Sequence, residues 1–190
     1  IADTDNDLDV TDFASLTVEA DEDQDELLLA LSDDDVDTVT FTGDSDIVLS
    51  ASAAVTVAET VFISNAGDFD TTDSGAFAAD TNITLHTDNV DVDLDLAAGT
   101  SQTITFGSTL DNNDVVTIAG FAGGNGVAAD TLDLSALGIG STADLTFTDS
   151  DSDNDNTDDT LTITSADFDG SIVLVATVTA DIIASNFDFA

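Results

Sequence analysis

The chain contains no lysine and no arginine, and this absence restricts its folding more than any other feature of the sequence. Its 190 residues include 41 acidic side chains and one histidine, which gives a formal net charge of −41 at pH 7. Repulsion among the carboxylates opposes compaction, and cations must come from solution to offset it. Because 42% of the residues are hydrophobic, we still expect a buried core rather than a disordered chain.

The kind of acid indicates which cation supplies the opposite charge. Only Glu19, Glu22, Glu26 and Glu59 are glutamates, and every other acid is an aspartate. Aspartate in short turns beside Gly, Asn and Ser is typical of loops that bind hard cations through carboxylate and carbonyl oxygens. We therefore predict Ca²⁺ as the cofactor. The alternative is an acidic surface adapted to high salt, in which we would expect Glu to share the load with Asp.

Missing residue types exclude several classes of function. Without Cys there is no disulfide, Fe–S cluster or thiolate zinc site. Without basic side chains the protein cannot neutralise phosphates, so neither nucleic acid nor an anionic membrane surface is expected as a direct partner. His86 is the only histidine, no serine lies in a nucleophile elbow, and Trp and Tyr are absent. We therefore predict that the protein is not an enzyme.

The targeting signal is expected at the C-terminus, or in an N-terminal segment that has been removed. No signal peptide is visible at Ile1, and no apolar run is long enough to span a bilayer, so membrane insertion is not expected.

Residues 1–35 are the first of three predicted regions, an acidic N-terminal segment. Residues 15–20 are a predicted strand, and residues 21–31 fit a short helix or a strand equally well. Three aspartates at spacing two match positions one, three and five of an EF-hand loop, but the glycine and the closing glutamate of that motif are absent. These three aspartates are either weak calcium ligands or part of a solvated acidic leader. They are Asp3, Asp5 and Asp7.

Residues 36–120 are the second region, a β-rich body in which Thr, Val, Ile and Phe alternate at period two. The predicted strands are 36–43, 46–50, 55–64, 82–87, 89–96, 102–107 and 114–121, with a protruding loop at 67–80. A Thr–apolar–Thr–apolar phrase recurs at irregular intervals: TVTF at 38, ITL at 83, TITF at 103, LTF at 145 and LTIT at 161. We predict an all-β fold, a β-solenoid or β-roll, with a β-sandwich as the alternative.

The segment 90–96 places apolar and acidic side chains on opposite faces of one predicted strand. Val90, Val92, Leu94 and Leu96 share one face, and Asp91, Asp93 and Asp95 share the other. The acidic face is either solvated or a metal-bridged contact with another subunit.

Residues 121–190 are the third region, which begins with a glycine-rich acidic turn. Gly123, Gly124 and Gly126 match the glycines of the repeat GGxGxDxUx, and Asp130 follows two residues later than the aspartate of that repeat. Strand-like segments follow, DTLDLSALG at 130 and SIVLVATV at 171. The region resembles the C-terminal module of RTX-like bacterial exoproteins, which are calcium-dependent, surface-layer-like and secreted by type I systems.

This resemblance implies a small antiparallel β module, a type I exporter as a partner during secretion, and an extracellular or cell-surface location. It also implies an uncleaved secretion signal whose apolar positions are Ile182, Ile183, Phe187 and Phe189.

An acidic tract between two predicted strands, residues 149–159, is the richest candidate for metal binding. It fits either a calcium loop or a disordered hairpin tip. The metal candidates of this region are Asp149, Asp151, Asp153, Asp155, Asp158 and Asp159, together with Asp130.

These observations favour a non-catalytic extracellular structural protein that associates with itself. Calcium would neutralise the acidic chain outside the cell, fold it and allow assembly into a filament, surface layer or matrix. The alternative is a secreted calcium-dependent adhesin or glycan-binding module, which would remain monomeric.

Overall fold

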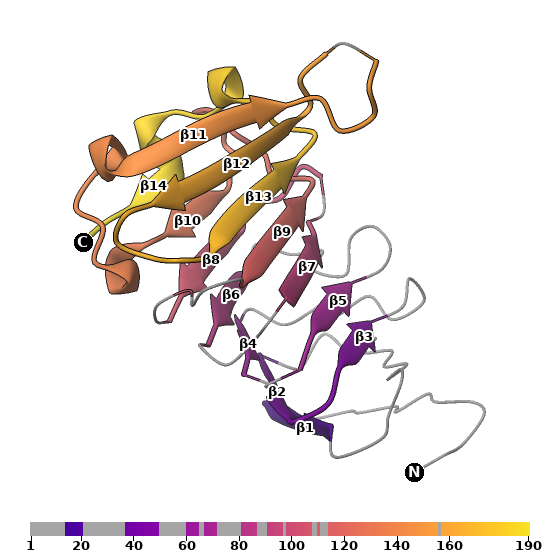
Figure 1. Ribbon diagram of the computed structural model, residues 1–190. Helices are drawn as coiled ribbons and strands as arrows, with labels where there is room; N and C mark the ends of the chain where they lie inside the picture. Colours follow the sequence, from indigo (N-terminus) through magenta and orange to yellow (C-terminus); the bar gives the residue numbers. More distant parts are fainter. Residues whose placement is uncertain are drawn as a thin grey trace.

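The protein is an all-β structure of two seven-stranded sheets whose inner faces share one hydrophobic core (Figure 1). The computed structural model describes residues 14–20, 37–49, 60–64, 67–71, 81–86, 91–96, 98–107, 110, 114–155 and 157–190.

Sheet A and sheet B are named here by their strands in spatial order. Sheet A contains β1 (Ser15–Ala20), β2 (Thr38–Gly43), β4 (Thr60–Ile63), β6 (Asn82–Leu85), β8 (Thr103–Phe106), β10 (Thr131–Asp133) and β14 (Phe187–Asp188). Sheet B contains β11 (Leu145–Ser150), β12 (Thr160–Ser165), β13 (Ser171–Val175), β9 (Val115–Ala119), β7 (Asp91–Asp95), β5 (Phe69–Thr71) and β3 (Ile47–Leu49). Four short 3₁₀ helices follow β10: η1 (Ser135–Leu137), η2 (Thr142–Asp144), η3 (Thr179–Asp181) and η4 (Ala184–Asn186).

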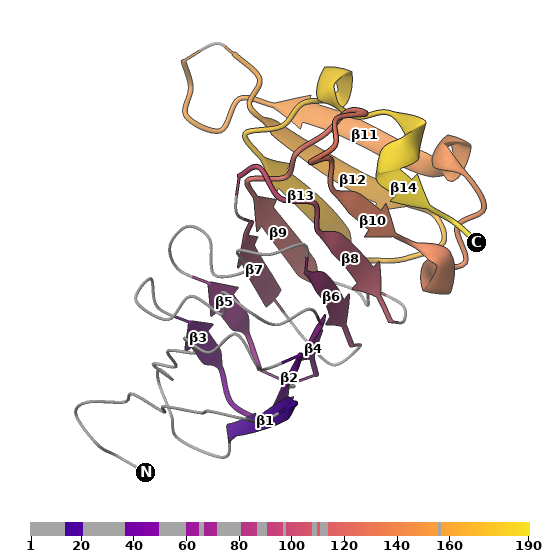
Figure 2. The same ribbon diagram turned by 180° about the vertical axis from the view of Figure 1, so that it is seen from behind.

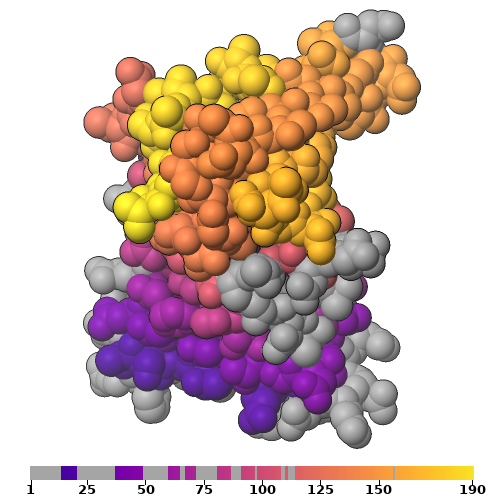
Figure 3. Space-filling model, turned by 60° about the vertical axis from the view of Figure 1, so that its left-hand side comes forward, coloured from indigo at the N-terminus to yellow at the C-terminus, as the bar shows by residue number. Residues whose placement is uncertain are grey.

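From β2 to β10 the chain alternates between the two sheets, and from β4 on each of these strands pairs in parallel with the strand one turn earlier. Thr38 lies beside Thr60, and Thr60 lies beside Asn82. A backbone hydrogen bond to a side chain links Asp68 to Asp46 across the same separation of 22 residues. Figure 3 shows the result, in which the colours stack in chain order from indigo to yellow.

The period-two pattern decides which side of each strand is buried. In β2, Val39 and Phe41 are buried while the intervening threonines are half-buried. The ring of Phe41 packs across the core against Phe69 of sheet B, with 5.1 Å between ring centroids. Because one face of each strand is more deeply buried than the other, the winding gathers these faces in a single layer between the sheets.

A hairpin interrupts this winding after β10. β11 and β12 are antiparallel, and β12 is antiparallel to β13. The chain then rejoins the parallel arrangement, because β13 pairs with β9 and β14 pairs with β10. Residues 121–190 therefore extend both sheets of the preceding region.

The predicted strands at 15–20, 36–43, 46–50, 82–87, 89–96, 102–107 and 114–121 are confirmed, and their ends agree to within two residues. Of the strand predicted at 55–64, the described part contains β4. The protruding loop predicted at 67–80 is wrong where it can be compared, because β5 occupies Phe69–Thr71 and buries Phe69. Residues 21–31, Val90 and the N-terminal aspartates Asp3, Asp5 and Asp7 lie outside the described residues.

Candidate calcium sites

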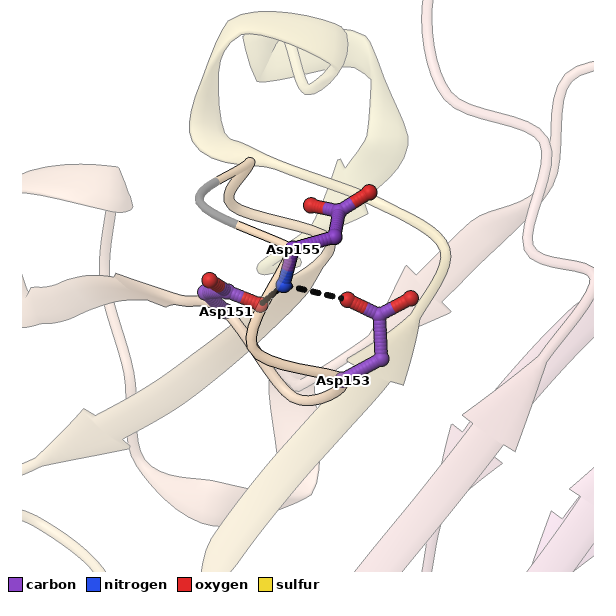
Figure 4. Close-up of side chains that lie close together, drawn as sticks. All are labelled: Asp151, Asp153 and Asp155. Carbon is purple, nitrogen blue, oxygen red and sulfur yellow. Dashed lines mark hydrogen bonds between the residues drawn. The ribbon is translucent and has the colours of Figure 1, made fainter.

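The loop after β11 gathers three of the predicted metal ligands, Asp151, Asp153 and Asp155. One carboxylate oxygen from each lies within 4.8 Å of the other two. The backbone N–H of Asp155 donates to Oδ1 of Asp151 at 3.2 Å and to Oδ1 of Asp153 at 3.0 Å (Figure 4). Asn154, with a φ of 62°, turns the chain between them. These hydrogen bonds therefore fold the loop so that the three carboxylates lie close together.

This arrangement suits a hard divalent cation. Three carboxylates at this separation repel one another, and the protein has no basic side chain to place among them. Ca²⁺ takes six to eight oxygen ligands, so backbone carbonyls and water would have to complete the shell. Asp151 is half-buried and the other two are exposed, which leaves the site open to solvent. In Figure 3 the loop projects from the body at the upper right.

The other three aspartates of the tract lie apart from this cluster. Asp159 accepts hydrogen bonds from the Ser152 N–H at 2.9 Å and the Thr160 hydroxyl at 3.0 Å, and these bonds lower the pKa of Asp159. Asp149 accepts from both the N–H and the hydroxyl of Thr179, at 2.7 and 2.9 Å. Asp158 is exposed. Asp159 therefore closes the base of the loop, and Asp149 attaches it to η3.

Asp130 is buried far from these groups. Its two carboxylate oxygens accept hydrogen bonds from the backbone N–H groups of Gln102 and Ala122, each at 2.7 Å. Burial raises the pKa of Asp130, and the two hydrogen bonds act against that rise. The carboxylate thus joins the start of β8 to the glycine-rich turn, a structural use of the side chain.

Asn186, which we did not single out in the sequence, completes this connection. It is fully buried. Its Oδ1 accepts from the N–H groups of Gly124 and Ile183, both at 3.0 Å, and its Nδ2 donates to the carbonyls of Gly124 and Asp130 at 3.2 and 2.9 Å. All four amide hydrogen-bonding positions of the side chain are used, three to fasten the C-terminal tail to Gly124 and Asp130 and one within the tail, to Ile183.

The glycines of that turn have a steric role. A Cβ at Gly123 would lie 2.3 Å from the backbone carbonyl oxygen of Asp181, so only glycine allows the turn and the tail to approach this closely. The glycine-rich turn that resembles a calcium repeat thus forms the surface on which the C-terminal tail packs.

Three of the four predicted secretion-signal residues meet at one small pocket of about 180 Å³, which is lined by Ile182, Ile183, Phe187 and Phe147 among others. Ile183 is 40% exposed, whereas Phe187 is buried. Phe189 lies outside the lining and stacks on Phe187 with 5.8 Å between ring centroids.

A further set of carboxylates lies on the outer face of sheet B. Asp70 of β5 lies directly beside Asp93 of β7. One row away, Asp68 donates its N–H to Oδ1 of Asp46 at 3.0 Å and accepts a hydrogen bond from the N–H of Asp91. Partial burial first, and then the neighbouring carboxylates, raise the pKa values of Asp68 and Asp70.

These acidic rows were only partly predicted. The alternation of Asp91, Asp93 and Asp95 away from the buried Val92 and Leu94 is confirmed. Asp46, Asp68 and Asp70 were missed because their proximity depends on the 22-residue turn. The available signal was the recurrence of Asp followed by an apolar residue, in DIVL at 46, DFDT at 68, DVDL at 91 and DVVT at 114.

Comparisons with known proteins add no relative to this description. No family model matches the sequence, and neither the search of curated proteins nor the search of solved structures returned a match. Within the described residues, no helix has the length and apolar character needed to cross a membrane.

Proposed function

We propose that this protein is a non-catalytic extracellular structural protein that requires calcium to fold and assembles with copies of itself. The observation that carries the proposal is the alignment of carboxylates in rows and in one loop, in a chain without any basic side chain to offset them. Calcium would bind the folded arrangement far better than the unfolded chain, so its binding energy would stabilise the fold.

We propose further that the body is a β-solenoid. Successive strands alternate between two sheets and pair with the strand one turn away, which supports a solenoid over a sandwich built from antiparallel Greek keys. Such a body has no need of a catalytic cleft, and it places the same chemical groups at the same position in each turn.

Self-assembly is supported by the two ends of the sheets. β1 is the first strand of sheet A, and β14 is the last. Both belong to a series of parallel pairs, so the chain directions allow β1 of one copy to continue sheet A of another. Repetition of that contact would give a head-to-tail polymer. A type I exporter is the proposed partner in secretion, as the resemblance of residues 121–190 implies; export of the full chain with and without the exporter would test that part.

The test is calcium addition to chelator-treated protein at low salt, followed by circular dichroism and electron microscopy. We expect β-structure to appear with calcium, followed by filaments or sheets. NaCl at equal ionic strength is the control for simple screening. Folding that depends on molar salt and ignores calcium would refute the metal requirement, and folding with calcium into monomers would refute assembly and favour a secreted adhesin.

The loop cluster has its own variant. Asp153→Asn combined with Asp155→Asn removes two of the three clustered carboxylates, and we expect a higher calcium concentration at the folding midpoint. The matched control is Asp167→Asn together with Asp169→Asn, which removes the same charge from outside the cluster. An equal shift in both double variants would show that only net charge matters.

A further inference from the structure

The outer face of sheet A carries a regular array of threonine side chains that the proposed function does not use. One row follows the first position of each strand: Ser15, Thr38, Thr60, Asn82, Thr103 and Thr131. A second row lies two residues further along: Thr17, Thr40, Phe62, Thr84 and Thr105. In the view of Figure 2 the strands of this sheet come to the front of the molecule.

The spacing of this array is fixed by the sheet. Adjacent strands lie about 4.8 Å apart, and positions two residues apart along a parallel strand are about 6.6 Å apart. The unbroken register from β1 to β8 therefore produces a two-dimensional grid made mostly of hydroxyl and methyl groups, which Asn82 interrupts in the first row and Phe62 in the second. Threonine is stiff at χ1, so each group is held in a narrow range of positions.

Several hydroxyls of this grid are available to solvent, whereas that of Thr105 donates to Oδ2 of Asp133 at 3.5 Å. Thr40, Thr84 and Thr103 are half-buried, and their side chains form no hydrogen bond with any other described residue. Each hydroxyl has one donor and two acceptor positions, which are the same kinds of contact that a water molecule offers. A grid of such groups can hold a repeating layer of water.

The array is also electrically neutral in a chain of extreme charge. The outward positions of β2, β4, β6 and β8 contain no acid, whereas those of β5 and β7 on sheet B contain Asp70, Asp91 and Asp93. On sheet A the acids lie at the ends, with Glu19 on β1 and Asp133 on β10. Such an uncharged, periodic surface is suited to binding a partner that is itself uncharged and periodic.

We propose that this threonine face binds ice. Ice presents uncharged water molecules on a regular lattice, so a rigid grid of hydroxyl and methyl groups can contact it at many points at once. Each contact is weak, but their number increases with every turn of the chain, and rigidity removes most of the ordering cost. A soluble glycan or protein lacks this periodicity, and the chain has no Trp or Tyr for stacking on sugars.

The test is thermal hysteresis, the gap between the melting and freezing temperatures of a single ice crystal in a solution of the full chain. This gap is insensitive to dissolved ions, so counterions do not produce it. The measurement is made in a buffer in which circular dichroism shows the protein to be folded. We expect a measurable gap, faceted crystals and enrichment of the protein in slowly grown ice.

Thr84→Tyr places a second bulky ring beside Phe62 and removes the hydroxyl and methyl group between Phe62 and Thr105, and we expect it to abolish most of the gap. The matched control is Thr117→Tyr, at a half-buried outward position of β9 on sheet B, which should retain it. Thermal unfolding of both variants shows whether either has lost its fold.

Three results would overturn the proposal. The first is a wild-type chain that is folded but shows neither hysteresis nor enrichment in ice. The second is an equal loss in both variants while both remain folded. The third is a wild-type dimer that Thr84→Tyr converts to a monomer, since a second copy would then cover the face.

Discussion

At the scale of single residues, the protein places like charges side by side and offsets them only from solution. Asp70 and Asp93 are direct neighbours on the outer face of sheet B, and burial together with this repulsion raises the pKa of Asp70. Like charges directly opposite one another on adjacent strands destabilise a sheet. The pair therefore weakens the fold in the absence of bound cations.

Asp70→Asn should raise stability in calcium-free, low-salt buffer by about 0.5 kcal/mol, because it removes the repulsion of one cross-strand pair. Denaturant unfolding followed by circular dichroism measures the change. Asp167→Asn is the control, since Asp167 is an exposed acid in a turn. If the control gave the same gain, the effect would come from net charge rather than from the paired position.

At the scale of elements, the C-terminal tail is held by a buried amide rather than by strand pairing alone. β14 contains only Phe187 and Asp188. Asn186, directly before it, makes three hydrogen bonds that connect the tail to the turn at Gly124 and to Asp130, and a fourth to Ile183 within the tail. Removing this side chain would take a partner from the buried carbonyl of Asp130 and from partly buried backbone groups of Gly124.

Asn186→Ala should cost about 2 kcal/mol or more, since each buried group left unsatisfied costs about 1–3 kcal/mol. Ser185→Ala in the same 3₁₀ helix is the matched control, because Ser185 is exposed. Hydrogen exchange should show faster exchange at Gly124 and Ile183 in Asn186→Ala alone. Unchanged exchange at these amides would show that strand pairing is enough to hold the tail.

The element scale also shows what the sequence could predict. Period-two alternation located nearly every described strand, because it depends only on neighbouring residues. The number of residues per turn could not be read from the sequence. The segment TVFI at 60 belongs to the threonine series but has Phe62 in place of the second threonine. The similar phrases at 145 and 161 belong to the antiparallel hairpin β11–β12. The intervals therefore appeared irregular.

The candidate sites also divide into those that could be predicted from the sequence and those that could not. Asp151, Asp153 and Asp155 were predicted, because ligands within one loop are close in sequence. Asp46, Asp68 and Asp70 required the pairing of distant strands, and Asn186 required knowledge of what the tail packs against. Local chemistry was thus visible in the sequence, while contacts between turns were not.

At the scale of the whole molecule, mild acid should stabilise the calcium-free protein. Asp68, Asp70 and Asp130 have pKa values raised above the ordinary 3.8. A group with a raised pKa contributes stability below the unfolded value, and that contribution is lost as the pH rises through the folded value. Asp159, whose pKa is lowered, acts in the opposite direction but is solvent-screened.

The thermal midpoint should therefore rise as the pH falls from 7 toward the ordinary Asp pKa, and scanning calorimetry in chelator at low salt would measure it. With calcium present the rise should shrink, because bound metal favours the ionised carboxylates. A midpoint that fell steadily over this range without calcium would contradict the expected sign.

The winding of the chain also determines how far the effect of a local change in stability extends along the molecule. In the proposed β-solenoid each turn contacts the turns before and after it, so its stability would be close to a sum of nearest-neighbour terms. Most strand partners lie about one turn apart, as Thr38 and Thr60 do, and a loop must be closed before each parallel pair can form, which makes such pairing slow. β13 and β14 are the exceptions, because their partners β9 and β10 lie on the other side of the hairpin β11–β12 in the sequence. A destabilising substitution in an early turn would therefore affect mainly that end of the molecule. The final turn, in contrast, can form only after the hairpin β11–β12 has folded.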